Sequence, residues 1–215
     1  MIFLHKTKNQ GEKKLARRSD HTREEIHQMA LEAAEAIAAQ EGLSGLSARK
    51  VASKIGYTVG TLYLVFKNLD DLILQVNDRT LSQLYKEMER VSSRQKTPET
   101  CILALSHAYI EFATNNTARW SMIYEHVLED NFVLPEPFQN QVQQMFALVE
   151  NALRPLGINK SDLEIAQAAR ALWSGIHGIC ILALTRNLDI AGIDSVQELA
   201  DTLITNFLNG FREKK

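Results

Sequence analysis

Residues 47–67 read SARKVASKIGYTVGTLYLVFK, and this segment constrains the architecture more than any other part of the chain. Ser47 and Thr58 each precede a short periodic run, and hydroxyl residues at such positions cap helix N-termini. Gly56 separates the two runs, where a helix end favours a residue that tolerates a positive φ. Two short capped helices joined by a tight turn are typical of a helix-turn-helix. We therefore expect the second helix, residues 59–65, to enter the major groove of DNA.

The side chains of this segment suit an interaction with a polyanion. Helices that begin after Ser47 and Thr58 present free backbone N–H groups, which are natural phosphate sites. Gly60 removes a side chain where backbone would approach DNA, and Thr61 and Tyr63 offer donors on the exposed face. Four cations accompany them: Arg49, Lys50, Lys54 and Lys67. A generic helical hairpin with solvated charges is the alternative, but the agreement of caps, small residues and lysine favours a DNA-binding motif.

The rest of the chain is predicted to be helical, so the expected fold class is all-α with about nine helices. Thr22 caps a helix to about residue 40, with Glu25 completing a capping box and Gly42 as its stop. Asn68 caps a long fourth helix to about residue 94, and Pro98 opens the next one. Further helices are expected near residues 117–127, 139–153, 162–187 and 196–211.

Charge and cysteine usage favour the cytoplasm. The net charge is −2, yet residues 1–18 hold six Lys and Arg residues against one Glu. This basic arm either contacts DNA or is a solubilising tail, and both interpretations stay open. Cys101 and Cys180 lie far apart, which favours a reducing compartment over a disulfide scaffold. We expect no secretory signal and no membrane span, because the longest apolar run, residues 176–184, is too short.

Residues 22–72 resemble the DNA-binding domain of the tetracycline-repressor (TetR) family. The resemblance rests on an alanine-rich first helix, a glycine stop, two caps and the run that follows them: residues 30–38, Gly42, Ser47, Val51-Ala52, Gly56, Thr58, Gly60-Thr61-Leu62-Tyr63 and Phe66-Lys67-Asn68. It implies a basic flexible arm over residues 1–21, a helix-turn-helix domain over 22–72, and a helical effector-binding and dimerisation domain over 73–215.

The resemblance also implies which residues touch DNA. Ser47 and Thr58 would hold phosphates at helix starts, and Val59, Gly60 and Thr61 would face the bases. Tyr63 and Lys67 would contact the backbone, and Arg49 is a nearby cation. The sequence departs from the family after Tyr63, where Leu64 and Val65 replace an aromatic residue and a His or Tyr. Val59 replaces a polar residue and could pack on a thymine methyl group. These departures leave the operator sequence open.

The C-terminal part resembles a subgroup that carries a Trp…His-Gly signature, here Trp173-Ser-Gly-Ile-His177-Gly178. One interpretation is a dimer interface formed by the last two helices, to which the stripe of Leu199, Leu203 and Phe207 would contribute. Another is the wall of an apolar ligand pocket, with candidates Phe112, Trp120, Tyr124, Phe146, Trp173 and His177. Ordinary core packing remains an alternative for each aromatic residue. His177 and Cys180 share a helical face, but the sequence offers no further metal ligands at matching spacing, so we expect no metal.

Together these features predict a DNA-binding transcriptional regulator, specifically a ligand-responsive homodimeric repressor on a pseudo-palindromic operator. Its partners would be double-stranded DNA and an unknown, largely apolar small-molecule effector. The sequence contains no phosphate-cradling glycine loop, paired histidine motif or nucleophile elbow, so we expect neither enzymatic activity nor a cofactor. The alternatives are a helical small-molecule-binding protein, or a regulator that acts through protein partners without specific DNA binding.

Overall fold

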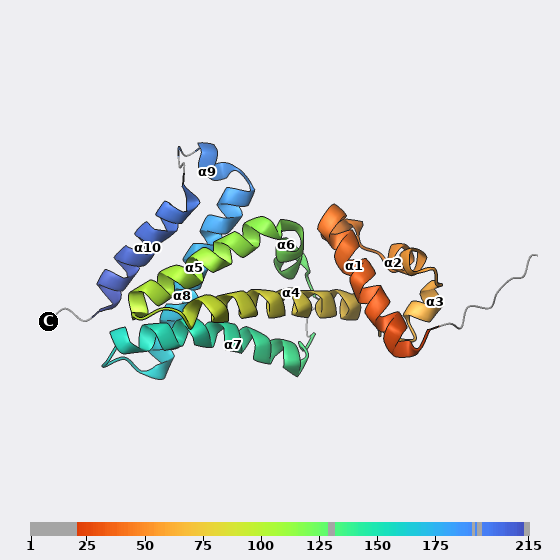
Figure 1. Ribbon diagram of the computed structural model, residues 1–215, viewed down its shortest axis with the longest axis horizontal. Coiled ribbons are helices and arrows are strands. Elements are labelled where there is room, and N and C mark those ends of the chain that lie inside the picture. Colours follow the sequence, from red (N-terminus) through yellow and green to blue (C-terminus); the bar gives the residue numbers. More distant parts are fainter. Residues whose placement is uncertain (1–20, 129–131, 191, 193–194, 213–215) are drawn as a thin grey trace, which may run out of the picture.

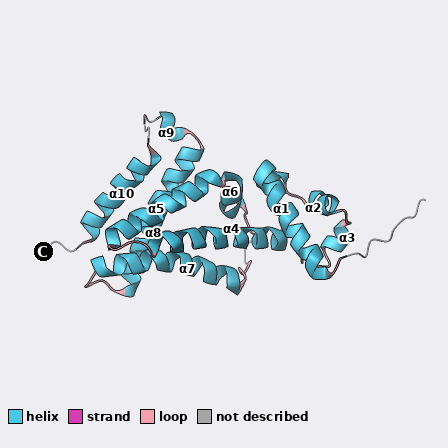
Figure 2. Ribbon diagram, in the orientation of Figure 1, coloured by secondary structure: helices cyan, strands magenta, loops and turns pink. Residues whose placement is uncertain are grey.

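The computed structural model describes residues 21–128, 132–190, 192 and 195–212, so nearly all of the basic arm lies outside the described residues. Within these ranges the chain is all-α, with ten α-helices, one 3₁₀ helix and no strand (Figures 1 and 2). The fold class is as predicted. The additional helix relative to the expected nine is α9 (Asn187–Ile190), a single turn after the long eighth helix.

Three helices form the N-terminal unit: α1 (Arg23–Gly45), α2 (Ala48–Ile55) and α3 (Val59–Leu62). The capping box of α1 is confirmed, because the Glu25 amide donates to Thr22 Oγ1 at 3.2 Å and the Thr22 amide donates to Glu25 Oε2 at 2.6 Å. Gly42 has a φ of 67° and interrupts α1, as expected, although a further helical turn follows it to Gly45.

Helix α3 is shorter than the predicted 59–65. The amides of Leu64 and Val65 donate to the carbonyls of Thr61 and Leu62, three residues back, so the chain tightens after Leu62. This tightening leads directly to Asn68, whose side chain caps α4 (Leu69–Ser92) by accepting from the Asp71 amide at 2.8 Å. Leu62 and Phe66 are buried in the N-terminal core, as their spacing predicts.

The long helix α4 runs from the N-terminal unit into the larger body (Figure 1). There it packs with the remaining elements: α5 (Pro98–Asn115), α6 (Thr117–Glu125), α7 (Glu136–Leu153), the 3₁₀ helix Arg154–Leu156, α8 (Asp162–Leu184) and α10 (Val196–Phe211). Pro98 lies in the first turn of α5, and Ser161 closes a capping box on α8. The apolar stripe Leu199, Leu203 and Phe207 of α10 packs inward against the C-terminal core.

Helix α6 joins the two cores. Trp120 is completely buried in the C-terminal core, whereas Met122, two residues later, is completely buried in the N-terminal core. Consecutive helical positions lie about 100° apart, so residues two apart point to nearly opposite sides of the helix. Arg79 of α4 adds a polar link, donating to Gln28 at 2.5 Å and to Glu35 at 3.3 Å on α1. The N-terminal unit is therefore attached to the body by both packing and hydrogen bonds.

We predict that Met122→Ala will lower the free energy of unfolding by about 3 kcal/mol, because it leaves a cavity where the two cores are joined. Urea denaturation followed by circular dichroism measures this change. The control is Ile158→Ala, at a side chain that is 86% exposed and should change stability little. Equal effects of the two substitutions would contradict the role assigned to Met122.

Candidate DNA interface and ligand cavity

The helix-turn-helix is held by its own caps. Ser47 Oγ accepts from the Lys50 amide at 3.3 Å, and Thr58 Oγ1 accepts from the Thr61 amide at 3.2 Å. The two threonine hydroxyls also lie within hydrogen-bonding distance, at 3.0 Å. Gly56 takes the left-handed conformation, with φ 76° and ψ 26°, between the two helices. These interactions fix the angle at which α3 follows α2.

Further interactions fix the motif at both ends. The Tyr57 hydroxyl hydrogen-bonds to His21 Nδ1 at 2.8 Å, which links the turn to the residue just before the α1 cap. The ring of His27 stacks on Phe66, with centroids 4.7 Å apart. The Lys67 amide donates to Asp71 Oδ2 at 2.8 Å, so the backbone at this lysine is held while its side chain is exposed.

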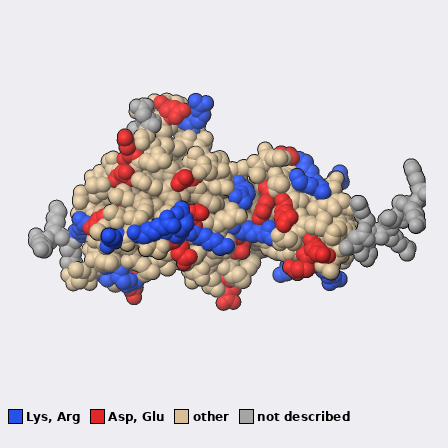
Figure 3. All heavy atoms as spheres, in the orientation of Figure 1, with Lys and Arg blue, Asp and Glu red and all other residues tan. Residues whose placement is uncertain are grey.

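The predicted DNA-contacting residues lie on one connected stretch, which the structure leaves largely open. Tyr63 is 45% exposed and Leu64 is 63% exposed. Arg49, Thr58, Gly60 and Lys67 are also exposed, while Ser47, Val59 and Thr61 are half-buried. A Cβ atom at Gly60 would meet only Thr58 Oγ1, at 3.6 Å, so packing inside the protein does not require glycine there. Lys and Arg atoms are visible over the α2 end of the molecule, with acidic residues nearby (Figure 3).

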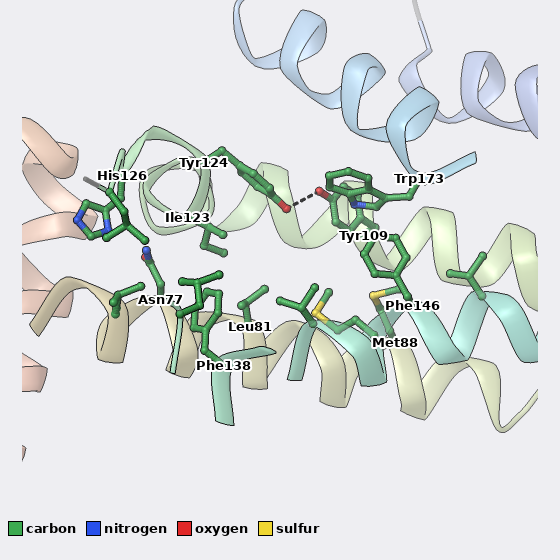
Figure 4. A pocket seen from close by; sticks show the side chains of 16 residues that line it. Asn77, Leu81, Met88, Tyr109, Ile123, Tyr124, His126, Phe138, Phe146 and Trp173 are labelled. Carbon is green, nitrogen blue, oxygen red and sulfur yellow. Dashed lines mark hydrogen bonds between the residues drawn. The ribbon is translucent and has the colours of Figure 1, made fainter. Parts of the chain in front are cut away.

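The body contains a partly open apolar cavity of about 300 Å³, lined by α4, α5, α6, α7, α8 and the connection between α6 and α7 (Figure 4). This volume is at the lower end of the range usual for small-molecule sites. Three of the six predicted pocket residues line it: Tyr124, Phe146 and Trp173. Among the residues that the structure describes, those that line the cavity include no Lys, Arg, Asp or Glu.

The other three predicted pocket residues lie elsewhere. Trp120 and His177 do not line the cavity but pack against residues that do, and their ring centroids lie 5.0 Å apart. Phe112 is buried away from the cavity, and this placement differs from the prediction. It follows Tyr109, the α5 residue in the wall, by three positions, so it lies about 60° further around the helix.

Sequence reasoning missed two polar residues of the cavity, Asn77 and His126. Asn77 is 1% exposed on α4, and its Oδ1 has no hydrogen-bond partner among the described residues. A signal was present, because Asn77 interrupts the apolar positions Leu74, Leu81 and Leu84 at helical spacing, and a polar residue in such a stripe is unusual. His126 Nε2 hydrogen-bonds to Asp70 Oδ1 at 2.9 Å, which links the cavity wall to the first turn of α4.

The end of the cavity at Trp173 contains a hydrogen-bonded group of three side chains. The Tyr109 hydroxyl lies 3.0 Å from the Tyr124 hydroxyl and 2.9 Å from His177 Nδ1. Burial raises the pKa of Tyr109 above its ordinary value and lowers the pKa of His177. Tyr109 therefore keeps its proton and can donate it to the neutral His177 imidazole. Cys180, whose pKa burial raises to about 12, is a neutral thiol, and the described residues contain no cluster of three metal-binding side chains.

Comparisons with known proteins agree with this geometry. Residues 30–76 match the family described as bacterial regulatory proteins, tetR family, and residues 102–207 match the tetracyclin repressor-like C-terminal domain. The uncharacterized HTH-type transcriptional regulator YobS of Bacillus subtilis is 25% identical over 182 residues, covering 85% of this chain and 90% of its own.

Solved structures share the fold. A protein of unknown function from Rhodococcus sp. RHA1 superposes with a TM-score of 0.74 at 19% identity, over 92% of this chain and all of its own. The transcriptional regulator FadR from Bacillus subtilis, solved in complex with stearoyl-CoA, gives a TM-score of 0.61 at 16% identity, over 86% of this chain and 98% of its own.

A capped, exposed helix-turn-helix on a helical body defines a DNA-binding transcriptional regulator. The family matches on both parts of the chain make the assignment specific. The protein belongs to the TetR family.

We predict that His177 makes the folded state sensitive to acid. Its pKa in the folded protein is lowered from 6.5 by burial, so the unfolded chain binds more protons at pH values between the two pKa values. The stabilisation of the folded state by the neutral, buried His177 is fully present above about pH 6.5, and it is lost as the pH falls toward the pKa of His177 in the folded protein. Between about pH 7 and pH 5, wild-type protein should lose more unfolding free energy than His177→Gln, as measured by urea denaturation. Parallel decreases in the two proteins would rule out this contribution.

Proposed function

We propose that this regulator is a ligand-responsive homodimeric repressor that binds a pseudo-palindromic operator. The observation that carries the proposal is the combination of an exposed helix-turn-helix and an apolar cavity in one chain, connected by α6. FadR from Bacillus subtilis, which shares this fold, was solved in complex with stearoyl-CoA, a molecule with an apolar acyl chain and a charged coenzyme A part, so a protein of this fold can hold a small molecule. An effector in the cavity would favour a spacing of the two helix-turn-helix motifs that no longer fits the operator.

For DNA recognition we propose the roles that family resemblance implies. Ser47 and Thr58 hold phosphates, Val59, Gly60 and Thr61 face the bases, and Tyr63 and Lys67 contact the backbone, while Arg49 adds a nearby cation. The exposure of the backbone-contacting side chains supports these roles. In a dimer, the two α3 segments would lie about 34–36 Å apart, one turn of DNA.

For the dimer we propose an interface through α8 and α10. Among the described residues, α8 is the one helix whose length and mean hydropathy of 1.2 would suffice to span a bilayer, yet only 33% of its most apolar part is buried. Its outer side carries a largely exposed stripe of small and apolar residues at helical spacing: Ala171, Ser174, Gly178 and Leu182. A Cβ atom at Gly178 would meet nothing within 4 Å. Such a stripe suits close packing against the same helix of a second copy.

We propose no catalytic role, because TetR-family proteins act as transcriptional regulators. A cytoplasmic location follows from action on chromosomal DNA. The effector would be small and largely apolar, as the cavity lining suggests.

We predict sequence-specific binding to a fragment of the DNA around its own gene, measured by gel shift across a range of salt concentrations. Lys67→Ala should weaken binding to all sequences about equally, and should lower the slope of log affinity against log salt by about 0.9 for each phosphate that the lysine neutralises. Lys86→Ala, at an exposed position of α4 in the body, is the matched control and should leave the slope unchanged. The absence of specific, salt-sensitive binding on every genomic fragment would overturn the proposed function.

We predict that Gly178→Arg will convert a dimer into a monomer in sedimentation experiments, because a large charged side chain would enter the proposed interface. The affinity for the operator should also fall, because each half-site would then be bound by a separate monomer. The matched control, Ile158→Arg, lies in the exposed connection before α8 and should remain dimeric. A wild-type protein that is monomeric at micromolar concentration would contradict the interface.

A further inference from the structure

The chemistry of the cavity wall restricts the charge of its ligand. Among the described residues, no Lys, Arg, Asp or Glu side chain lines the cavity. The sequence from residue 120 to residue 153, which includes the whole of α7, contains no Lys or Arg. A carboxylate or phosphate in this cavity would lose its hydration without gaining a cation, which is strongly unfavourable. The wall therefore favours an uncharged molecule.

The two ends of the cavity differ in their polar groups (Figure 4). At the end near Trp173, the hydroxyls of Tyr109 and Tyr124 hydrogen-bond to each other, and the Tyr109 hydroxyl also hydrogen-bonds to His177. That end presents mainly rings and apolar surface, from Trp173 and Phe146. Because both tyrosine hydroxyls have partners inside the protein, neither of them requires a polar group of the ligand.

The opposite end contains an unmet acceptor. Asn77 is 1% exposed, it lines the cavity, and its Oδ1 has no partner among the described residues. The neighbouring His126 does not fill this need through Nε2, which is engaged with Asp70 at 2.9 Å. Buried acceptors without a partner are rare in proteins, and one that faces a cavity indicates that a ligand donor completes it.

We propose that the cavity binds an uncharged, mainly apolar molecule with one hydrogen-bond donor, such as an alcohol, whose donor reaches Asn77 Oδ1 while its apolar part lies toward Trp173. This inference rests on the proposed function, because it names the effector class for the same cavity. Asn77 is a specificity-determining residue that distinguishes a donor from an isomer without one. The lack of cations in the wall selects against the corresponding acid.

The test compares three compounds of similar size by direct binding: n-nonanol, its isomer octyl methyl ether, and nonanoate. Trp173 lies in the wall, so intrinsic tryptophan fluorescence reports occupancy without DNA present. At about pH 8, where the acid is ionised, nonanol should bind roughly fivefold more tightly than the ether, the value of one neutral hydrogen bond, and more than about tenfold more tightly than nonanoate. If nonanoate binds as well as nonanol, or the ether equals the alcohol, the proposal is wrong.

Asn77→Leu tests the residue itself. Leucine has a similar size and removes the acceptor, so the preference for nonanol over the ether should fall to about one while the ether still binds. Asn140→Leu, at an exposed position of α7, is the matched control and should keep the wild-type preference. A preference that survives in Asn77→Leu would overturn the assignment. If that variant fails to fold, the comparison of the three compounds on wild-type protein still decides the ligand class.

The two proposals fail separately. The fluorescence titrations contain no DNA, so a wrong order of affinities among the three compounds rejects the ligand class and leaves the gel-shift result intact. Binding of nonanol in the expected order, together with no specific DNA binding, would reject the repressor function and support the cavity assignment.

Discussion

Trp120 and Met122 are two residues apart on α6, and each is completely buried in a different hydrophobic core. A short helix with side chains in both cores cannot move in one without disturbing the other, because packed interiors are dense and have little free space. The next residues, Ile123, Tyr124 and His126, line the apolar cavity. The same few turns of chain therefore serve the body, the cavity and the surface on which α1 rests. This arrangement gives a physical route by which cavity contents could bias the position of the DNA-binding unit.

Much of the fold could be predicted because it is determined locally. The caps at Thr22, Ser47, Thr58 and Asn68 act within three residues, and each appears in the structure with its expected hydrogen bond. Pro98 likewise opens α5, since its fixed φ suits a first turn. The inward faces of the N-terminal helices follow from the 3.6-residue period alone.

The cavity was harder to predict because it depends on how five helices meet. Tyr124, Phe146 and Trp173 were expected there, but aromatic residues at helical spacing on any one helix do not reveal which neighbour they face. Phe112 shows the difficulty, since about 60° of rotation around α5 moves it away from the wall. The stripe on α10 was similarly ambiguous, and Leu203 packs inward, within 2.6 Å of the position a Cβ on Gly175 would occupy. The identity of the residues and the helical repeat determine which face of a helix is apolar. Which neighbouring element that face contacts is determined only when the helices assemble.

Helix α8 presents Trp173 to the cavity and, on its opposite side, the largely exposed stripe that includes Ala171 and Gly178. A helix with its side chains is only about 10–12 Å across. In a dimer joined along this stripe, the two cavities would be separated by little more than two helices. If a ligand shifted α8, the shift would meet the partner's α8 directly, and any resulting change in the second site's affinity would make the response to effector concentration steeper or shallower than that of a single site.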